Sequence, residues 1–206
     1  MWRLALFLLW AQVDPRADQL IQRSHKKLKS LSYITVDFAY TLEDRADTTH
    51  RKIHYQGTFR YKPRHNKFAV DIGDRAIFCD GTTIWQFLRK EREVNVSAYN
   101  PKESFSLERV FRLYERDMKV RWDKTEAQAG RTLHKVSLFP ISEVDYFRVE
   151  VWIEAQSELP YRVRFWYRDG QVETYELRRY GTQAIPDTAF VFNPAAYPGV
   201  QIIDLR

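Results

Sequence analysis

The sequence is short of several features that would identify a chemistry. Its 206 residues include a single cysteine, Cys79, so no internal disulfide can form. Seven glycines and eight prolines are too few for a collagen-like or low-complexity chain. No GxSxG, P-loop, GxGxxG, CxxC or HExxH motif occurs in the chain. These absences exclude the commonest sequence signatures of hydrolases, nucleotide-binding enzymes and zinc proteins.

Histidines and carboxylates show no spacing suited to metal binding or acid–base catalysis. His50 and His54 are the only histidines close together in the sequence, and four residues of extended strand span about 13 Å. Glu150 and Glu154 alternate with apolar residues and are expected to face solvent. We therefore expect no metal, no cofactor and no catalytic residue. An enzyme stays open as an alternative, because catalytic groups are assembled in space and not in sequence.

The excess of positive charge is small. Thirty-three lysines and arginines against 27 aspartates and glutamates leave a net charge of +6. The basic residues are scattered and mostly alternate with apolar ones, which is typical of the solvated face of a sheet. We therefore expect no nucleic-acid partner, although the charge would permit an anionic one.

No hydrophobic run is long enough to cross a membrane. The apolar run over residues 4–11 has eight residues, against roughly 20 needed to span a bilayer. With Arg3 before it, the run predicts a signal peptide over residues 1–11 and one exported, soluble domain over residues 12–206. The alternative is a buried or frayed N-terminal segment. Because no cysteine follows the signal, we expect no lipid anchor on this protein.

Two segments have the apolar spacing of amphipathic helices. Asp14 and Pro15 are residue types favoured at an N-cap and a first helical position, and the pattern after them predicts a helix over residues 15–31. A second helix is predicted over residues 106–116. Its apolar face carries four side chains: Leu107, Val110, Phe111 and Tyr114.

From residue 33 the apolar period changes from that of a helix to two. Outside the central helix, the pattern predicts ten or eleven antiparallel strands that are apolar on one face. Asp80-Gly81 and Asp169-Gly170 are typical of tight turns between such strands. So long a one-sided sheet must curl on itself or be covered, and the two helices are available as a cover.

Aromatic side chains dominate the apolar face of the predicted sheet. The chain contains 13 Phe, 12 Tyr and 6 Trp residues, 15% of the total. One interpretation is a packed core beneath the helices. The other is an apolar cavity for a hydrophobic ligand, with the helices as a lid. Periodicity does not distinguish a filled interior from an empty one, so both stay open.

Several short stretches follow one another in a recognisable order along the chain. They are DFAYT (37–41), GTFRYKP (57–63) with NKFAVDI (66–72), DGTTIW (80–85) with EVNVS (93–97), and AFVFNPAAYPGVQIIDLR (189–206). In this order they resemble the outer-membrane lipoprotein carrier proteins, the LolA-type periplasmic chaperones. The similarity extends over the whole mature chain, including the basic N-terminal helix and the helix midway.

The resemblance implies a mainly β fold, an incomplete antiparallel barrel of about eleven strands whose N-terminal and central helices act as a lid. It implies a monomeric periplasmic protein with a hydrophobic cavity for the acyl chains of lipoproteins. Its partners would be an ATP-driven inner-membrane transporter that releases lipoproteins and an outer-membrane acceptor. We assign the cavity wall to Val36, Phe38, Phe59, Tyr61, Phe68, Val70, Trp85, Phe87, Val149, Val151 and Phe165.

The lid is assigned to the apolar face of the central helix together with Lys62. The family often has an arginine before the proline of this strand turn, where the arginine contacts the lid helices. This chain has Lys62 there, in the sequence YKP. Lysine keeps the charge but lacks the planar guanidinium fork, so we expect any latch through Lys62 to be weaker.

Other functions stay open beside the carrier. A membrane-anchored acceptor of similar fold is one, and the missing cysteine after the signal argues against it. Another half-barrel protein that binds a hydrophobic ligand, a sensor, or an enzyme on the same fold is also possible, because fold does not determine function. Polar groups that converge inside the cavity would favour an enzyme.

Overall fold

The structure, a computed structural model, describes residues 14–46, 52–100, 110 and 118–206. Its one complete α-helix is α1 (Pro15–Ser30). The strands are β1 (Ile34–Asp44), β2 (Lys52–Lys62), β3 (Lys67–Ile72), β4 (Arg75–Cys79), β5 (Thr83–Leu88), β6 (Glu93–Ala98), β7 (Met118–Gln128), β8 (Arg131–Pro140), β9 (Tyr146–Glu154), β10 (Pro160–Tyr167), β11 (Gln171–Gly181) and β12 (Gln201–Asp204). Short 3₁₀ turns are η1 (Pro63–His65), η4 (Asp187–Phe190) and η5 (Pro194–Ala196).

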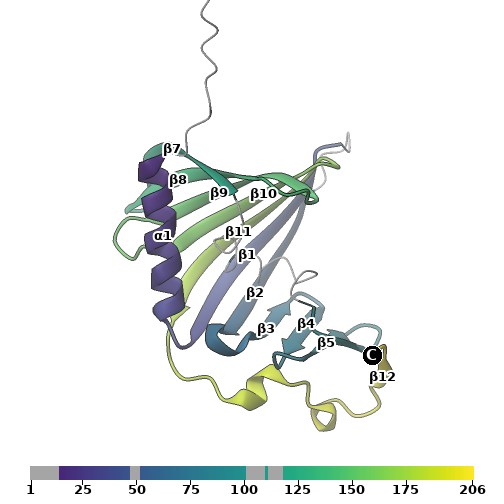
Figure 1. Ribbon diagram of the computed structural model, residues 1–206. Coiled ribbons are helices and arrows are strands. Elements are labelled where there is room, and N and C mark those ends of the chain that lie inside the picture. The colour runs from purple at the N-terminus through teal and green to yellow at the C-terminus, as the bar shows by residue number, and fades with distance from the viewer. Residues whose placement is uncertain (1–13, 47–51, 101–109, 111–117) are drawn as a thin grey trace, which may run out of the picture.

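These strands form a single curved sheet with two open ends. Their order is β12-β6-β5-β4-β3-β2-β1-β11-β10-β9-β8-β7, so the sheet ends at β12 and β7 (Figure 1). All neighbours are antiparallel except β12, which pairs in parallel with β6. The mainly β, incompletely closed fold is confirmed. The expected count of about eleven strands becomes twelve, and the last is not antiparallel as predicted.

Helix α1 begins where the sequence predicts and is fixed at its start to the sheet. The Asp14 carboxylate accepts hydrogen bonds from the backbone N–H groups of Arg16 (3.0 Å) and Ala17 (3.3 Å), and Pro15 is the first helical residue. The other oxygen of Asp14 accepts from the Trp122 N–H in β7. One residue therefore caps the helix and attaches it to a terminal strand of the sheet.

The predicted tight turns are present, and one glycine inside a strand is required by packing. Gly170, in the β10–β11 turn, has a φ of 93°, which is open to glycine at no steric cost. The Asp80 side chain accepts hydrogen bonds from the backbone N–H groups of Thr82 and Thr83 between β4 and β5.

In β2, a Cβ on Gly57 would lie 2.6 Å from the Phe38 ring, so only glycine leaves room for that ring at this position.

The curved sheet has two apolar faces covered by different segments. The concave face, called here the inner face, packs against α1 and contributes to one large buried cluster that also contains Val110. On the opposite, outer face of β4–β6, a second cluster packs Phe87 against Phe192 of the C-terminal segment, residues 182–200. Strand alternation separates the two, because Ile77 belongs to the inner cluster and its neighbour Ala76 to the outer one.

Two predicted segments lie mostly outside the described residues. The signal peptide over residues 1–11 does so entirely, and the central helix over residues 106–116 does so except for Val110. Val110 is helical and fully buried. Within the described part of the chain, no helix combines the length and apolar character that a membrane crossing would need.

Candidate functional site

The inner face brings together most of the residues predicted to line a cavity. Nine of the eleven belong to the inner cluster, and none of the nine is more than 5% exposed. They come from five strands that lie on both sides of β1 and β11. These nine are Val36 and Phe38 in β1, Phe59 and Tyr61 in β2, Phe68 and Val70 in β3, Val149 and Val151 in β9, and Phe165 in β10.

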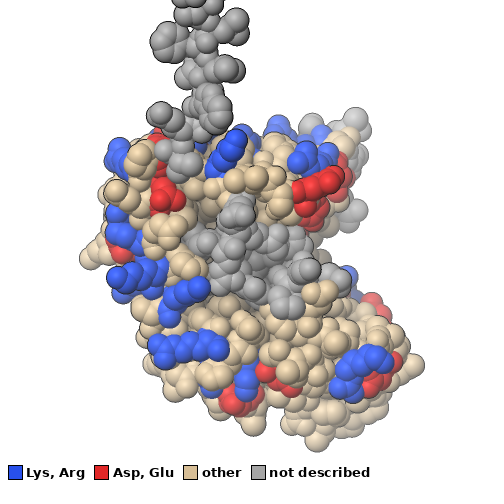
Figure 2. All heavy atoms as spheres, in the orientation of Figure 1, with Lys and Arg blue, Asp and Glu red and all other residues tan. Residues whose placement is uncertain are grey.

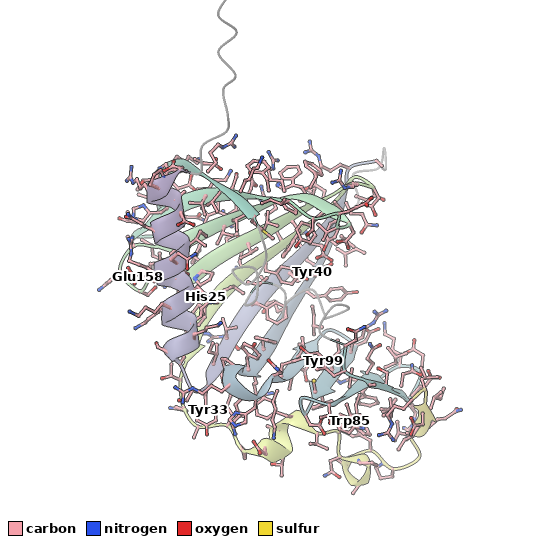
Figure 3. All side chains as sticks on the ribbon, viewed as in Figure 1. His25, Tyr33, Tyr40, Trp85, Tyr99 and Glu158 are labelled. Carbon is pink, nitrogen blue, oxygen red and sulfur yellow. The ribbon has the colours of Figure 1, made fainter. Side chains whose placement is uncertain are left out.

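Trp85 and Phe87 are placed differently from the prediction. Both pack in the outer cluster, where the Phe87 ring lies 5.3 Å from Phe192 and 4.6 Å from Tyr197. Ile84, which directly precedes Trp85 in β5, packs against the inner cluster instead. Strand β5 is apolar on both faces because the C-terminal segment covers its outer side, so periodicity alone could not tell which face was inner. Figure 3 shows Trp85 beside that segment.

Phe147 does not share the inner face with Val149 and Val151, although it has the same parity in β9. Its side chain is 43% exposed, whereas its neighbour Tyr146 is buried in the inner cluster. The pairing of β9 with β10 shifts register between Trp166 and Tyr167, opposite this point. The irregularity reverses the alternation at the start of β9, which an uninterrupted period of two could not predict.

Lys62, predicted to be part of the lid, points away from the inner face and pairs with the C-terminal segment. Its Nζ lies 2.9 Å from Asp187 Oδ1 in η4, while Lys67 Nζ lies 2.9 Å from the other Asp187 oxygen. The preceding residue, Tyr61, is in the inner cluster, so strand alternation directs Lys62 outward. The two ammonium groups hold the pKa of Asp187 at about 2. Lys62 therefore fixes the C-terminal segment to the outer face.

The cover of the inner face consists, among described residues, of α1 and Val110. Leu20, Ile21 and Leu28 of α1 are buried in the inner cluster with Val110. Val110 lies in the connection between β6, which is next to the end strand β12, and β7, which is the end strand on the other side of the sheet. The other predicted lid residues, Leu107, Phe111 and Tyr114, lie outside the described residues.

An apolar pocket opens at the C-terminal end of α1 and reaches the inner cluster. Its volume is about 290 Å³, and its lining includes Leu28, Ile34 and Tyr61, which all belong to that cluster. Lys29 and Arg64 also line it, so positive charge stands beside apolar wall. Figure 2 shows further lysines and arginines along α1. We call this the rim pocket.

A carboxylate, that of Glu173, stands among the apolar residues of the inner face. Glu173 in β11 pairs across the strands with Phe165 in β10, and it shares its face with Tyr175 of the inner cluster. Three tyrosine hydroxyls donate to Glu173: Tyr40 at 3.1 Å, Tyr167 at 2.8 Å and Tyr175 at 3.4 Å. We call these four residues the Glu173 cluster.

Sequence reasoning missed the Glu173 cluster, although a signal existed. In β11, Glu173 has the same parity as Tyr175 and Leu177, two apolar-face residues, so alternation already directs it inward. Burial and the negative charge of Glu173 raise the pKa of Tyr40 above its usual value. The Tyr40 hydroxyl therefore keeps its proton and remains a donor. Figure 3 shows Tyr40 on the concave side of the sheet.

Glu150, which was expected to face solvent, is on the outer face but is only 5% exposed. Lys135 Nζ lies 2.7 Å from its carboxylate, and the Trp166 indole N–H donates to it at 3.1 Å. Arg164 lies near the same carboxylate and near the Trp152 ring. The outer surface of β8–β10 is thus a network of paired charges and tryptophans with a structural role.

No group of three or more potential metal ligands is gathered among the residues that the structure describes. The one cysteine, Cys79, is buried in β4, and its sulfur accepts from the Gly81 N–H. The arrangement offers an apolar surface and one polar cluster, which suit binding more than bond-making chemistry.

Comparison with solved structures identifies the fold. An uncharacterised conserved protein from Thermus thermophilus superposes with a TM-score of 0.58 at 13% identity, over 92% of this chain and 99% of that one. The lipoprotein LppX of Mycobacterium tuberculosis superposes with a TM-score of 0.55 at 14% identity, over 84% of this chain and 98% of LppX. A LolA-superfamily protein from Nitrosomonas europaea covers 85% and 97% at 14% identity, but with a TM-score of 0.41.

The likeness is one of fold and not of sequence. No protein-family profile matches the chain, and no curated protein matches it in sequence. At these identities the superpositions on the Thermus thermophilus protein and on LppX establish a shared fold and leave ligand and partners undetermined.

Proposed function

We propose that this protein is a periplasmic carrier that binds the acyl chains of lipoproteins on its inner face and shuttles them from the inner to the outer membrane. The observation that carries the proposal is the inner cluster itself. Among the described residues, a continuous aromatic and aliphatic surface from five strands packs against α1 and Val110, and not against a second sheet. A cover of that kind can move away from the inner face without breaking the backbone hydrogen bonds between the strands.

Acyl chains would replace the cover and not fill an existing void. The nine wall residues are already buried, in one cluster with side chains of α1 and Val110. Each methylene that an acyl chain removes from water contributes about 0.8 kcal/mol. A chain of ordinary length therefore compensates for exposing the few apolar side chains of α1. The rim pocket, where Leu28 meets Ile34 and Tyr61, is the place at which a chain would enter.

Support for a carrier and not an enzyme comes from what the inner face holds. Its converging polar groups are three tyrosine hydroxyls on one carboxylate, without a nucleophile and base pair among the described residues. The resemblance in sequence to LolA-type chaperones and the fold shared with the lipoprotein LppX favour lipidated ligands.

Photolabelling of the unmodified protein tests the proposal. A lipopeptide with two palmitoyl chains, each carrying a terminal diazirine, would be irradiated in the complex and the adducts mapped by mass spectrometry. We expect adducts on inner-face peptides from β2, β9 and β10. The matched control is internal, because the equally apolar outer cluster around Phe87 and Phe192 should stay unlabelled.

Labelling of both clusters alike, or of the outer cluster alone, would contradict the assignment of the inner face. The transport role has its own test, which is release of newly made lipoproteins from spheroplasts. Addition of the purified protein should release them into the medium, as acceptance from an inner-membrane transporter requires. Labelling on the inner face without such release would leave a lipid binder of another role.

A further inference from the structure

The Glu173 cluster is an unusual feature for a surface that holds acyl chains. Glu173 is half-buried among the inner-face aromatic residues, and its neighbours across the strands are Phe165 and Leu42. A charged carboxylate taken from water must be compensated by hydrogen bonds or by an opposite charge. Here the compensation comes from neutral donors, the hydroxyls of Tyr40, Tyr167 and Tyr175.

No positive side chain shares this site within the described residues. Every lysine, arginine or histidine that forms an ion pair in that part of the chain does so with a different carboxylate. A carboxylate offers about four lone-pair positions, of which the three hydroxyls take three. One acceptor position and a full negative charge therefore remain for a ligand.

The surrounding rings suit a cation as well. The Tyr40 and Tyr175 rings lie 5.1 Å apart and tilted, and Tyr55 stacks on Tyr40 with a centroid distance of 6.4 Å. On the other side, Tyr167 lies 6.3 Å from both Phe165 and Tyr146. Aromatic faces around a cation attract it through their quadrupoles, and the attraction is stronger where water is excluded.

We propose that the Glu173 cluster binds a primary ammonium group that lies next to the acyl chains of the ligand. The inference rests on the proposed function and makes it more specific. Among acylated molecules, those with a free amino group beside the acyl chains would be preferred. A diacylated lipopeptide with an unmodified N-terminal amine is such a ligand, whereas its N-acylated form has no positive charge to offer.

The inference is tested with two ligands that differ in one group. One is a dipalmitoylated lipopeptide with a free α-amino group, and the other is the same molecule with that amine acetylated. Affinities for the unmodified protein are measured at pH 6.5, where the free amine is charged. Because a hydrogen bond to a charged group is involved, we expect the free-amine ligand to bind roughly tenfold to hundredfold more tightly.

Two variants assign the preference to its source. Glu173→Gln keeps the shape and one accepting oxygen but removes the charge, so the ratio of the two affinities should fall toward one. Glu176→Gln is the matched control three positions along the same strand. Glu176 pairs with Arg162 and Arg178 on the outer face, and its replacement should leave the ratio unchanged.

The possible results separate this inference from the proposed function. Equal affinities of the unmodified protein for both ligands would overturn the ammonium site and leave the carrier intact. A preference that survives Glu173→Gln in a folded variant would also overturn it. Binding of neither ligand would overturn the carrier and the ammonium site together.

Discussion

At the scale of single residues, Asp187 has the clearest electrostatic role in the molecule. Lys62 and Lys67 each contact one of its oxygens and lower the pKa of its carboxyl from 3.8 to about 2. A carboxyl whose pKa is lower in the folded than in the unfolded state stabilises the fold above the unfolded pKa. That contribution is lost as the pH falls from about 4 through 2.

This linkage predicts how Asp187→Asn behaves. At pH 6 the variant should unfold at a lower temperature than the unmodified protein, and near pH 2 the two unfolding temperatures should nearly coincide. Circular dichroism melts across the pH series measure the difference. A gap that stays constant down to pH 2 would show that the two lysines do not stabilise the fold through the charge of Asp187.

A second residue-scale prediction uses two phenylalanines on opposite faces. Phe59 lies on the inner face and Phe87 on the outer, and both are nearly or fully buried. Replacement of either by leucine should cost about 1 to 2 kcal/mol of stability. Only Phe59→Leu should weaken binding of a fluorescent acyl probe, by a few-fold, because only that ring would contact the chain. Equal weakening in both variants would mean that destabilisation alone explains the loss.

At the scale of elements, α1 is the part of the cover that can be tested directly. Asp14 caps it and accepts from the Trp122 N–H of β7. Asp14→Ala should cost about 1 kcal/mol and lower the unfolding temperature by about 2–4 °C in a chain of this size. Because α1 would leave the inner face more often, uptake of a fluorescent acyl probe in stopped-flow measurements should become faster.

The control for this prediction is Asp14→Asn, which keeps an accepting oxygen at the cap. It should retain both the unfolding temperature and the uptake rate. If Asp14→Ala melts earlier but takes up the probe at the unchanged rate, α1 is not the part of the cover that opens.

The elements also show how far local signals reach. Helix α1 was predictable because its cap, first proline and apolar spacing all lie within 17 residues, and the β10–β11 hairpin because Asp169-Gly170 is a local turn signal. The face of β5 was not predictable, because it depends on the C-terminal segment more than 90 residues away covering Phe87. The parallel pairing of β12 with β6 depends on the same long-range contact.

Among the site residues, the same distinction holds. Val36, Phe38 and Phe165 could be assigned to one surface because strand alternation is regular around them. The face of Phe147 could not be assigned, because the register shift between β9 and β10 is not visible in the alternation of apolar and polar residues. Lys62 was assigned by resemblance to a lid contact, whereas its parity relative to Tyr61 directs it to the other face.

At the scale of the whole molecule, the curved sheet separates two tasks. Its outer face binds the C-terminal segment near β4–β6 and carries a network of paired charges near β8–β10. In the described part of the chain, its inner face is covered by α1 and Val110 and not by strands. We therefore propose that the outer face stabilises the fold and that the inner face exchanges ligand.

Native mass spectrometry of the protein recovered from the periplasm of an exporting host tests this account most directly. The spectrum should contain a species heavier than the mature chain by one diacylated peptide or lipid, which denaturation releases in stoichiometric amount. A mature chain of unaltered mass, which also gains no mass when an excess of dipalmitoylated lipopeptide is added, would contradict the claim that the inner face accepts acyl chains.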